Sequence, residues 1–589
     1  MALTATARPT AAWSSLHCHA YWRPAHTDAF LTGTVAPMLA ELRGAGLVEE
    51  WFFVRHVEHG PHLRIRVRGA GRATTGDLRA RLAAAVRDAP YPADDEVRQA
   101  YLRAAADPGT LRAHGEVHEA DYTPETARYG GAAALPVAEE VFCRSSVIAA
   151  AVVGQTAGAA RRLAAATDFV LVTACALGLD ALGTVRWLRG GVIGWRAYTD
   201  GTNAVPMTVP GAAVDAAAAQ SRAVVRRWED IRRAGASGTR LRDQWAGCVT
   251  AARARLETTA ADQPDGTDPA TGPRTADAAQ AADRAAWLQV WLSHLHMLLN
   301  RLGVPPEEER ALYWFIASSL LAPDGATDYF ADHPGAADRR YLDASNFVPS
   351  RIQEQRPRPS PDGPKRSRHR PSAGAPTALP AGEPRHVTLH DALALRTSGY
   401  GDLGGPVHAE ELGALLWPAY AGRAEPGGHA QPSRPYPSAG AQYAARLRLV
   451  VRHADGLAPG IYEPDPATRM LLPVAAAPTA AELASASMWF GLGAAPLPRS
   501  VDVSTLPVLA GLYVELGPLR ARYGLRALRF GYLEAGHLAQ NLALTAVAAG
   551  LSLGMVGGFH DDVAHELFLL DGIDDVLAYL LPIGRPAPR

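Results

Sequence analysis

The stretch Tyr523–Phe559 reads YGLRALRFGYLEAGHLAQNLALTAVAAGLSLGMVGGF and organises the second half of the chain. Its middle, Tyr532–Ala549, is apolar nearly all round and lacks proline, which predicts a buried central helix. Gly550 is a natural residue to end that helix. Gly557 and Gly558 then let the backbone approach a flat ligand closely and offer bare N–H donors. The pattern is equally consistent with a core helix followed by a glycine turn.

The composition is that of an ordinary globular protein with more than one domain. The chain has 589 residues, 48% of them hydrophobic and 20% charged, which is more than a single core usually serves. A net charge of −1 creates no overall field that would attract nucleic acid or membrane. Lys365 is the only lysine, so arginine must bind phosphates and carboxylates in the folded domains.

The cysteines do not form a metal or disulfide pattern. Cys18, Cys143, Cys175 and Cys248 are scattered and no CxxC spacing occurs. His17 and His19 flank Cys18, but in a strand the two histidines share a face and the cysteine points away. We therefore expect no metal site. With no signal peptide and no apolar run of membrane length, we expect a location in the reducing cytoplasm.

Three regions follow from the pattern along the chain. Residues 1–350 open with strand patterns and continue with helical ones, which predicts an α+β domain. Residues 351–385 are rich in Pro, Arg, Ser and Gly and predict a disordered linker, whose basic run PKRSRHR is expected to be solvated. Residues 386–589 alternate helices with short strands and predict an α/β domain. Asp262–Arg274 predicts a loop inside the first domain.

Two turns of the second domain carry candidate ligand-binding groups. Arg396, Thr397 and Ser398 follow the short helical pattern LHDALAL, and an arginine with two hydroxyls suits a phosphate. The turn at RPYPSAG, which includes Pro437–Gly440, is fixed by its prolines and glycine.

These motifs, with ELGALLWPAYAG, GLAPGIYEPDP, GMVGGFHDD and the closing LLPIGRP, resemble the SagB-type azoline dehydrogenases, flavin enzymes of the nitroreductase fold that act on thiazole/oxazole-modified peptides. The resemblance implies FMN bound at a homodimer interface. It assigns the FMN phosphate to Arg396, Thr397 and Ser398, with Arg585 as a helper. It assigns the flavin ring to Pro437, Ser438, Ala439, Gly440, Gly557 and Gly558.

Oxidation of an azoline removes a ring proton and a hydride, so a base is needed beside the flavin. The family places a Lys-Tyr pair there, and this chain has Arg522-Tyr523. We expect Tyr523 to be the base, with the positive charge of Arg522 favouring its deprotonated form. Polar residues of the central helix are expected to have hydrogen-bonded packing roles: Glu534, His537, Gln540 and Asn541.

One strand of the first domain carries a row of cations. The segment His62–Arg68 alternates strictly, so His62, Arg64, Arg66 and Arg68 share one face. Like charges in such a row repel one another, so we expect an anionic partner to neutralise them. An exposed basic strand neutralised by ions from the solvent is the alternative. Arg55 is expected to join this face. Arg128 precedes a glycine pair, and His296, Asn300 and Arg301 lie about one turn apart on a helix.

The segments WFFVRH, HGPHLRIRVRG, ETARYGG and HMLLNRLG resemble the thiopeptide-type glutamate-elimination domain of lantibiotic dehydratases. That family removes glutamate from glutamyl-Ser or glutamyl-Thr and leaves dehydroalanine or dehydrobutyrine. The resemblance implies that Arg64, Arg66 and Arg128 clamp the glutamate carboxylates and stabilise an enolate. His296 would protonate the departing carboxylate. Arg55 and His62 are further candidates.

Both resemblances together predict a bifunctional tailoring enzyme of thiopeptide biosynthesis that acts on one ribosomal precursor peptide. A separate tRNA-dependent glutamyl transferase and a cyclodehydratase or leader-binding protein would supply its substrates, with no direct nucleic-acid contact. Two alternatives stay open. The first domain could be a pyridine-forming cycloaddition enzyme, or a non-catalytic module that presents the peptide to the dehydrogenase.

Overall fold

The computed structural model describes residues 12–104, 107–156, 158–198, 208–234, 240–261, 276–324, 329–330, 332–333, 335–349, 353–358, 374–422, 433–493 and 497–585. The chain divides into two units. One comprises Met1–Trp187 with Gln220–Gly325, and the other Leu188–Ala219 with Ala326–Arg589. By their contacts, the described residues 188–198, 208–219 and 335–349 group with the second unit. The predicted loop Asp262–Arg274 and the run PKRSRHR lie outside the described residues.

The first unit is built on a four-stranded antiparallel sheet. Its strands are β1 (Trp13–His19), β2 (Glu50–His56), β3 (His62–Arg68) and β4 (Val117–Ala120), in the order β2-β3-β1-β4. The helices α1 (Pro24–Phe30) and α2 (Ala36–Gly44), with a π-helical turn at Leu31–Val35 between them, connect β1 to β2. Helix α3 (Arg72–Arg87) follows β3, with α4 (Asp95–Ala104) before β4. This βαββαβ order is that of ferredoxin-like folds.

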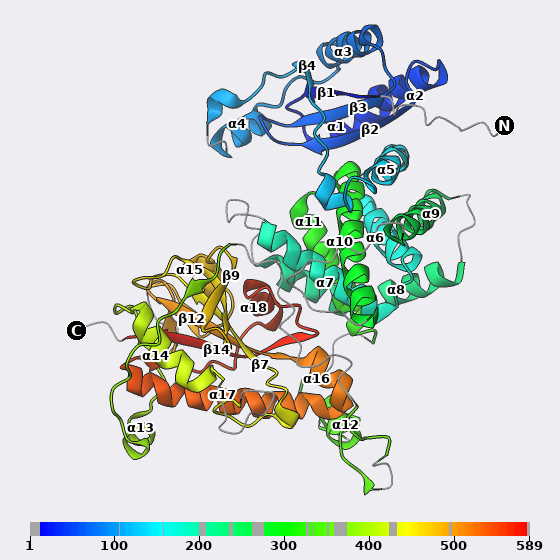
Figure 1. The fold of residues 1–589 in the computed structure, drawn as a ribbon. Coiled ribbons are helices and arrows are strands. Elements are labelled where there is room, and N and C mark those ends of the chain that lie inside the picture. The colour runs from blue at the N-terminus through cyan, green and yellow to red at the C-terminus, as the bar shows by residue number, and fades with distance from the viewer. Residues whose placement is uncertain are drawn as a thin grey trace, which may run out of the picture. The chain divides into compact units, whose positions relative to one another are not determined.

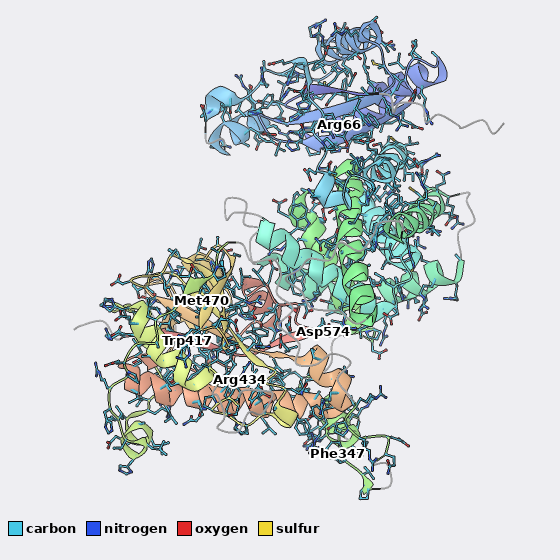
Figure 2. The ribbon with its side chains drawn as sticks, viewed as in Figure 1. Arg66, Phe347, Trp417, Arg434, Met470 and Asp574 are labelled. Atoms are coloured by element: carbon cyan, nitrogen blue, oxygen red, sulfur yellow. The ribbon has the colours of Figure 1, made fainter. Side chains whose placement is uncertain are left out.

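The strict alternation of β3 gives the sheet two different faces. Leu63, Ile65 and Val67 are buried on one face together with Leu16 and Cys18 of β1. Helix α3 lies over this face (Figure 1), and its residues Leu78, Leu82 and Val86 are buried. The histidine and arginine side chains of β3 lie on the opposite face, where Figure 2 marks Arg66.

Long helices complete the first unit: α5 (Leu135–Gln155), α6 (Ala159–Ala176), α9 (Leu241–Ala261), α10 (Ala276–Leu302) and α11 (Pro306–Leu321). Helices α7 (Ala181–Tyr198) and α8 (Thr208–Ala234) are divided between the two units. Side chains of helices α5 and α10 form hydrogen bonds with backbone groups of β2, the edge strand of the sheet. Ser146 Oγ accepts a hydrogen bond from Phe53 N at 3.1 Å, and Asn300 bonds Arg55 N at 3.0 Å and Arg55 O at 2.9 Å.

The second unit contains a seven-stranded antiparallel sheet in the order β13-β14-β12-β7-β8-β9-β5. The strands are β5 (Thr377–Ala378), β7 (Ala445–Val451), β8 (Gly460–Asp465), β9 (Met470–Ala475), β12 (Val508–Glu515), β13 (Ser552–Leu553) and β14 (Asp575–Gly584). Short parallel strands form a second sheet: β6 (Gly401–Asp402), β10 (Phe490–Gly491) and β11 (Val501–Asp502). The described fold is therefore α/β, as predicted.

Helices cover both faces of the large sheet. On one face lie α14 (Ala409–Tyr420) and the central helix α17 (Ala527–Ala549), packed on Leu447, Leu449 and Leu512 (Figure 1). On the other face, α18 (Asp561–Leu567) packs with Val450, Leu509 and Leu580. The shorter helices are α12 (Ala337–Ala344), α13 (Leu389–Leu395), α15 (Ala480–Ala484) and α16 (Leu516–Tyr523).

The predicted central helix is confirmed, with one correction. Helix α17 ends at Ala549, and Gly550 follows in the left-handed conformation with φ of 72°. However, Tyr532 and Leu533 are 45% and 60% exposed. The helix is therefore buried along one face rather than all round, and it keeps an apolar pair at its surface.

Part of the segment predicted as a disordered linker is ordered. Residues 359–373 lie outside the described ranges, but Thr377–Ala378 pairs with β9 as the edge strand β5. Arg385 N also donates to Ala548 O at 2.8 Å. Backbone hydrogen bonds to the second unit therefore order this stretch despite its composition.

Within the described ranges, no single helix has the length and hydropathy needed to span a bilayer. The pair Ala159–Ala176 and Ala181–Trp195 passes that test only when taken together, with a bend of 118° between them.

Candidate active sites

Arg64 and Arg66 lie side by side on the polar face of β3, as the alternation predicts. Arg64 Nε lies 3.1 Å from His62 Nε2, and its Nη2 forms an ion pair of 2.8 Å with Glu58. The guanidinium of Arg66 stacks over Tyr122 at 4.6 Å from the ring centroid. Burial lowers the pKa of Arg66 and the neighbouring Arg64 adds to that shift, whereas the Glu125 carboxylate opposes it.

Arg55 does not join this row, so that expectation is wrong. Arg55 lies opposite Leu63 in the register of β2 and β3, which puts it on the apolar face. Its Nη2 pairs with Asp28 at 2.6 Å, and Arg162 pairs with the other oxygen of the same carboxylate at 2.6 Å. Arg55 therefore belongs to a buried structural network that joins α1 to α6.

Arg128 lies on a 3₁₀ turn (Thr126–Tyr129) that ends at Gly130, whose φ is 90°. Its Nη1 pairs with Glu125 at 2.9 Å and its Nε donates to Ser293 Oγ at 3.3 Å. Glu125, which pairs with Arg128, is 59% exposed.

His296 lies on α10 one turn after Ser293, so it shares the helix face that contacts Arg128. Its Nδ1 is 2.8 Å from Glu309 Oε2, and the other oxygen of this buried carboxylate accepts from the Tyr313 hydroxyl at 2.7 Å. Asn300 and Arg301, by contrast, bond the backbone of β2. His296 is thus oriented by an acid, whereas its two helix neighbours are structural.

The same sheet face holds a group of histidines that the sequence analysis did not bring together, and His118 is the member that it did not name. His17 and His19 of β1, His62 of β3 and His118 of β4 lie next to one another across three strands. Burial is the main cause that lowers the pKa of His17 and His19 to about 3 and that of His62 to about 4, with mutual repulsion adding to it. These side chains are therefore neutral imidazoles at neutral pH. We call His17, His19, His62 and His118 the histidine cluster.

In the second unit, the predicted phosphate-binding residues lie at the β13–β14 edge of the sheet. Arg396, Thr397 and Ser398 follow α13, and Ser398 forms a parallel bridge with Leu553. The side chain of Arg396 has no hydrogen-bond or ion-pair partner in the described part of the chain, which leaves its donors free for a ligand. Arg585 is engaged instead, because it pairs with Glu411 at 2.6 Å and donates to Pro406 O at 3.0 Å.

The turn 437–440 is held by the central helix. Ser438 Oγ donates to Glu534 at 2.6 Å and accepts from Tyr443 N at 2.7 Å, while the other Glu534 oxygen accepts from Ala445 N at 2.8 Å. Asn541 Nδ2 donates to Pro435 O at 2.8 Å. Figure 2 marks Arg434, where this segment begins, beside α17. Glu534 and Asn541 thus have the packing role expected of them.

Tyr523 lies against that turn. Gly440 has φ of 57°, and a Cβ there would lie 2.2 Å from the Tyr523 hydroxyl. Arg522 Nε lies 3.1 Å from the same hydroxyl. A cavity of about 320 Å³ opens beside the pair, and its lining includes five arginines: Arg356, Arg358, Arg520, Arg522 and Arg526. Tyr523, the predicted base, therefore lines a cavity that is rich in arginine, which we call the cationic hollow.

The glycine pair forms the other part of the predicted flavin site. Gly557 and Gly558 are exposed, and a Cβ on Gly558 would lie 3.0 Å from Trp489 Nε1. Ser487 Oγ donates to Gly558 O at 2.6 Å. The residues within 4 Å of these two glycine positions do not include 437–440. A flat phosphorylated cofactor nonetheless suits three of these features. They are the exposed backbone at Gly557 and Gly558, the side chain of Arg396, and the turn at Gly440, where a side chain would collide with Tyr523.

Comparisons with known proteins match two successive parts of the chain to two different families. Residues 13–320 match the family described as "Lantibiotic biosynthesis dehydratase C-term", and residues 404–585 match the nitroreductase family. The nitroreductase-family protein MJ1384 of Methanocaldococcus jannaschii is 27% identical over 199 residues, which cover 34% of this chain and 91% of that protein.

Two solved structures are also similar. The pyridine synthase TbtD from thiomuracin biosynthesis has 17% identity, covers 53% of this chain and 97% of its own, and gives a TM-score of 0.39. A nitroreductase-family structure from Anabaena variabilis has 20% identity and a TM-score of 0.32, with coverage of 42% of this chain. This chain spans 45% of that relative's length. The chain belongs to the lantibiotic dehydratase C-terminal family, and a nitroreductase domain follows that family region.

Proposed function

We propose that this protein tailors a ribosomal thiopeptide precursor in two ways. The first unit eliminates glutamate from glutamylated Ser or Thr to give dehydroalanine or dehydrobutyrine. The second oxidises azolines to thiazoles or oxazoles with FMN. The observation that carries the proposal is that two of the three candidate arginines, Arg64 and Arg128, already pair with glutamate carboxylates of the chain itself.

In the elimination, His296 would take the α-proton of the glutamylated residue as a base, the Cβ–O bond would break, and a Cα=Cβ double bond would form as glutamate leaves through its carboxyl oxygen. Arg64, Arg66 and Arg128 would bind the carboxylates of the leaving glutamate in place of Glu58 and Glu125. The same cations would stabilise the enolate that forms when the α-proton leaves. His296, oriented by Glu309, would deliver a proton to the departing carboxylate.

In the oxidation, Arg396, Thr397 and Ser398 would hold the FMN phosphate. Pro437, Ser438, Ala439, Gly440, Gly557 and Gly558 would line its ring, whereas Arg585 is already committed to Glu411. Bound FMN supplies a two-electron acceptor. Tyr523 would take the ring proton as a phenolate and become the neutral phenol, and the donor at Arg522 Nε would stabilise the phenolate before that transfer. The cationic hollow beside Tyr523 is where we place the peptide segment that carries the azoline.

A homodimer through the second unit is part of the proposal. Tyr532 and Leu533 form an exposed apolar pair on α17, the helix that holds the turn 437–440. A second copy that covers this pair would bring further residues toward the flavin. The pathway would also need the separate glutamyl transferase and the cyclodehydratase or leader-binding protein expected from the sequence.

The test uses the full-length protein with two synthetic peptides, one glutamylated on Ser and one carrying a thiazoline. We expect free glutamate and a dehydroalanine peptide from the first, and loss of two hydrogens from the second when FMN is present. Ring closure between two dehydroalanines, without glutamate release, would identify the first unit as a cycloaddition enzyme. Binding of both peptides without any change in mass would reduce it to a presenting module.

A further inference from the structure

The histidine cluster brings four imidazoles from three strands to one place on the sheet. His19 lies directly opposite His62 in the β1–β3 register, and His17 lies directly opposite His118 in the β1–β4 register. Ring centroids are 4.5 Å apart for His19 and His62, and 4.8 Å apart for His17 and His62. His118 lies 5.4 Å from His19. The four rings therefore lie against one another, and three of these ring pairs are stacked.

His19 is the residue whose state most needs explanation. Its side chain is 1% exposed, and neither ring nitrogen has a hydrogen-bond partner within the described ranges. A buried imidazole that leaves both nitrogens unsatisfied costs free energy, because water would have bonded them in the unfolded chain. A ligand that accepts a nitrogen lone pair would remove part of that cost.

The geometry suits a metal ion bound by nitrogen. The ligand atoms of His17, His19 and His62 all lie within 4.8 Å of one another. Two nitrogens of a tetrahedral zinc site are about 3.3 Å apart, given Zn–N distances of roughly 2.0–2.1 Å. Small side-chain rotations would close the difference. The His62 ring is held by the 2.9 Å contact between its Nδ1 and Gly60 O, which leaves Nε2 as the nitrogen available to a metal.

We propose that His17, His19 and His62 bind one divalent transition-metal ion, with His118 or water at the fourth position. Imidazole ligands favour Zn²⁺, Ni²⁺, Co²⁺ or Cu²⁺ over Mg²⁺ and Ca²⁺, which prefer oxygen. Cys18 does not take part, because it lies on the opposite face of the sheet. The proposal does not depend on the reactions proposed above.

Arg64 is the natural competitor of the metal. Its Nε lies 3.1 Å from His62 Nε2, the nitrogen that the metal needs. The metal would therefore displace Arg64, whose Nη2 already reaches Glu58 at 2.8 Å. Metal binding and the position of Arg64 are thus coupled, and removing the Arg64 side chain should strengthen metal binding.

The test is equilibrium dialysis of the full-length protein, with any affinity tag removed, against Zn²⁺ or Co²⁺, followed by elemental analysis and the Co²⁺ visible spectrum. We expect one equivalent of metal per chain and the absorption bands of tetrahedral Co²⁺. His17→Ala and His19→Ala should each lower the affinity at least tenfold, whereas His390→Ala, an exposed histidine of α13, should leave it unchanged. Arg64→Ala should raise it.

His17 is only half-buried, so His17→Ala keeps the test valid if His19→Ala fails to fold. Wild-type protein that takes up no metal at micromolar concentrations would overturn the proposal. So would metal binding that is unchanged in folded His17→Ala protein, or an Arg64→Ala variant that binds metal more weakly than wild type.

Discussion

Arg522 Nε lies 3.1 Å from the phenol oxygen of Tyr523, and the same oxygen lies against the left-handed turn at Gly440. Two consecutive residues at the end of α16 thus present a hydroxyl and its cationic donor to the turn that we assign to the flavin ring. The phenol oxygen therefore has a cationic donor beside it, which suits the role of general base that we propose for Tyr523.

Replacement of Tyr523 by Phe should lower the rate of azoline oxidation by about 10²–10⁴-fold, the range for loss of a general base. The measurement is single-turnover oxidation followed by mass spectrometry, together with flavin absorbance to show that FMN still binds. Tyr329→Phe is the matched control, because Tyr329 is 91% exposed. Unchanged oxidation in Tyr523→Phe would remove this residue from the mechanism.

Gly440→Ala should destabilise the second unit and impair oxidation. An alanine would be strained at φ of 57°, and its Cβ would collide with the Tyr523 hydroxyl at 2.2 Å. The expected cost is about 1–3 kcal/mol in the free energy of unfolding. In Gly536→Ala, the new Cβ meets nothing within 4 Å, so helix α17 should gain roughly 0.5–1 kcal/mol. Denaturant unfolding of both variants checks the contrast.

His296→Ala should stop glutamate release while leaving azoline oxidation intact, since the two sites lie in different units. Glu309→Gln should have an intermediate effect, because it removes the charge that orients the imidazole at 2.8 Å but keeps a hydrogen-bonding group. A free-glutamate assay on a glutamylated peptide separates these outcomes. Equal glutamate release by the wild type, His296→Ala and Glu309→Gln would show that another residue delivers the proton.

The stability of the second unit should fall as the pH drops below about 6.5. Burial, assisted by Arg189, lowers the pKa of His565 to about 4 from the ordinary value of 6.5. Because the pKa is lower in the folded state, His565 contributes its full stabilisation at pH values above the unfolded-state pKa. As the pH falls below that value, the unfolded chain binds a proton that the folded protein does not, and the free energy of unfolding decreases. The loss would reach on the order of 3 kcal/mol at pH 4. Thermal unfolding at pH 7.5 and 5.0 should show a smaller difference in His565→Gln.

Local patterns made the main elements predictable. The apolar run of α17 and its stop at Gly550 depend on neighbours a few residues apart, and so does the alternation of β3. Contacts between distant segments were not predictable in the same way. The sequence analysis placed Arg55 on the wrong face of the sheet. Its side chain lies on the same face as Leu63 because of the register between β2 and β3, which the sequence of β2 alone does not give.

The histidine cluster shows the same limit. His17 and His19 are visible in one strand, but His62 and His118 join them only through the pairing of β3 and β4 with β1. Arg585 matches the family motif, yet its donors are taken by Glu411, which is 174 residues away in the sequence. Strand β5 is likewise ordered by its pairing with β9 at the edge of the sheet, which the composition of β5 itself does not predict.

Glu58 and Glu125 are each 59% exposed, while the arginines they pair with are largely covered. An arriving glutamate would therefore exchange one carboxylate for another, and the guanidinium groups would not have to be stripped of water first. In the elimination that we propose, binding would exchange one counter-ion for another at nearly constant net charge, and Glu58 and Glu125 would pair with the arginines again once the product leaves.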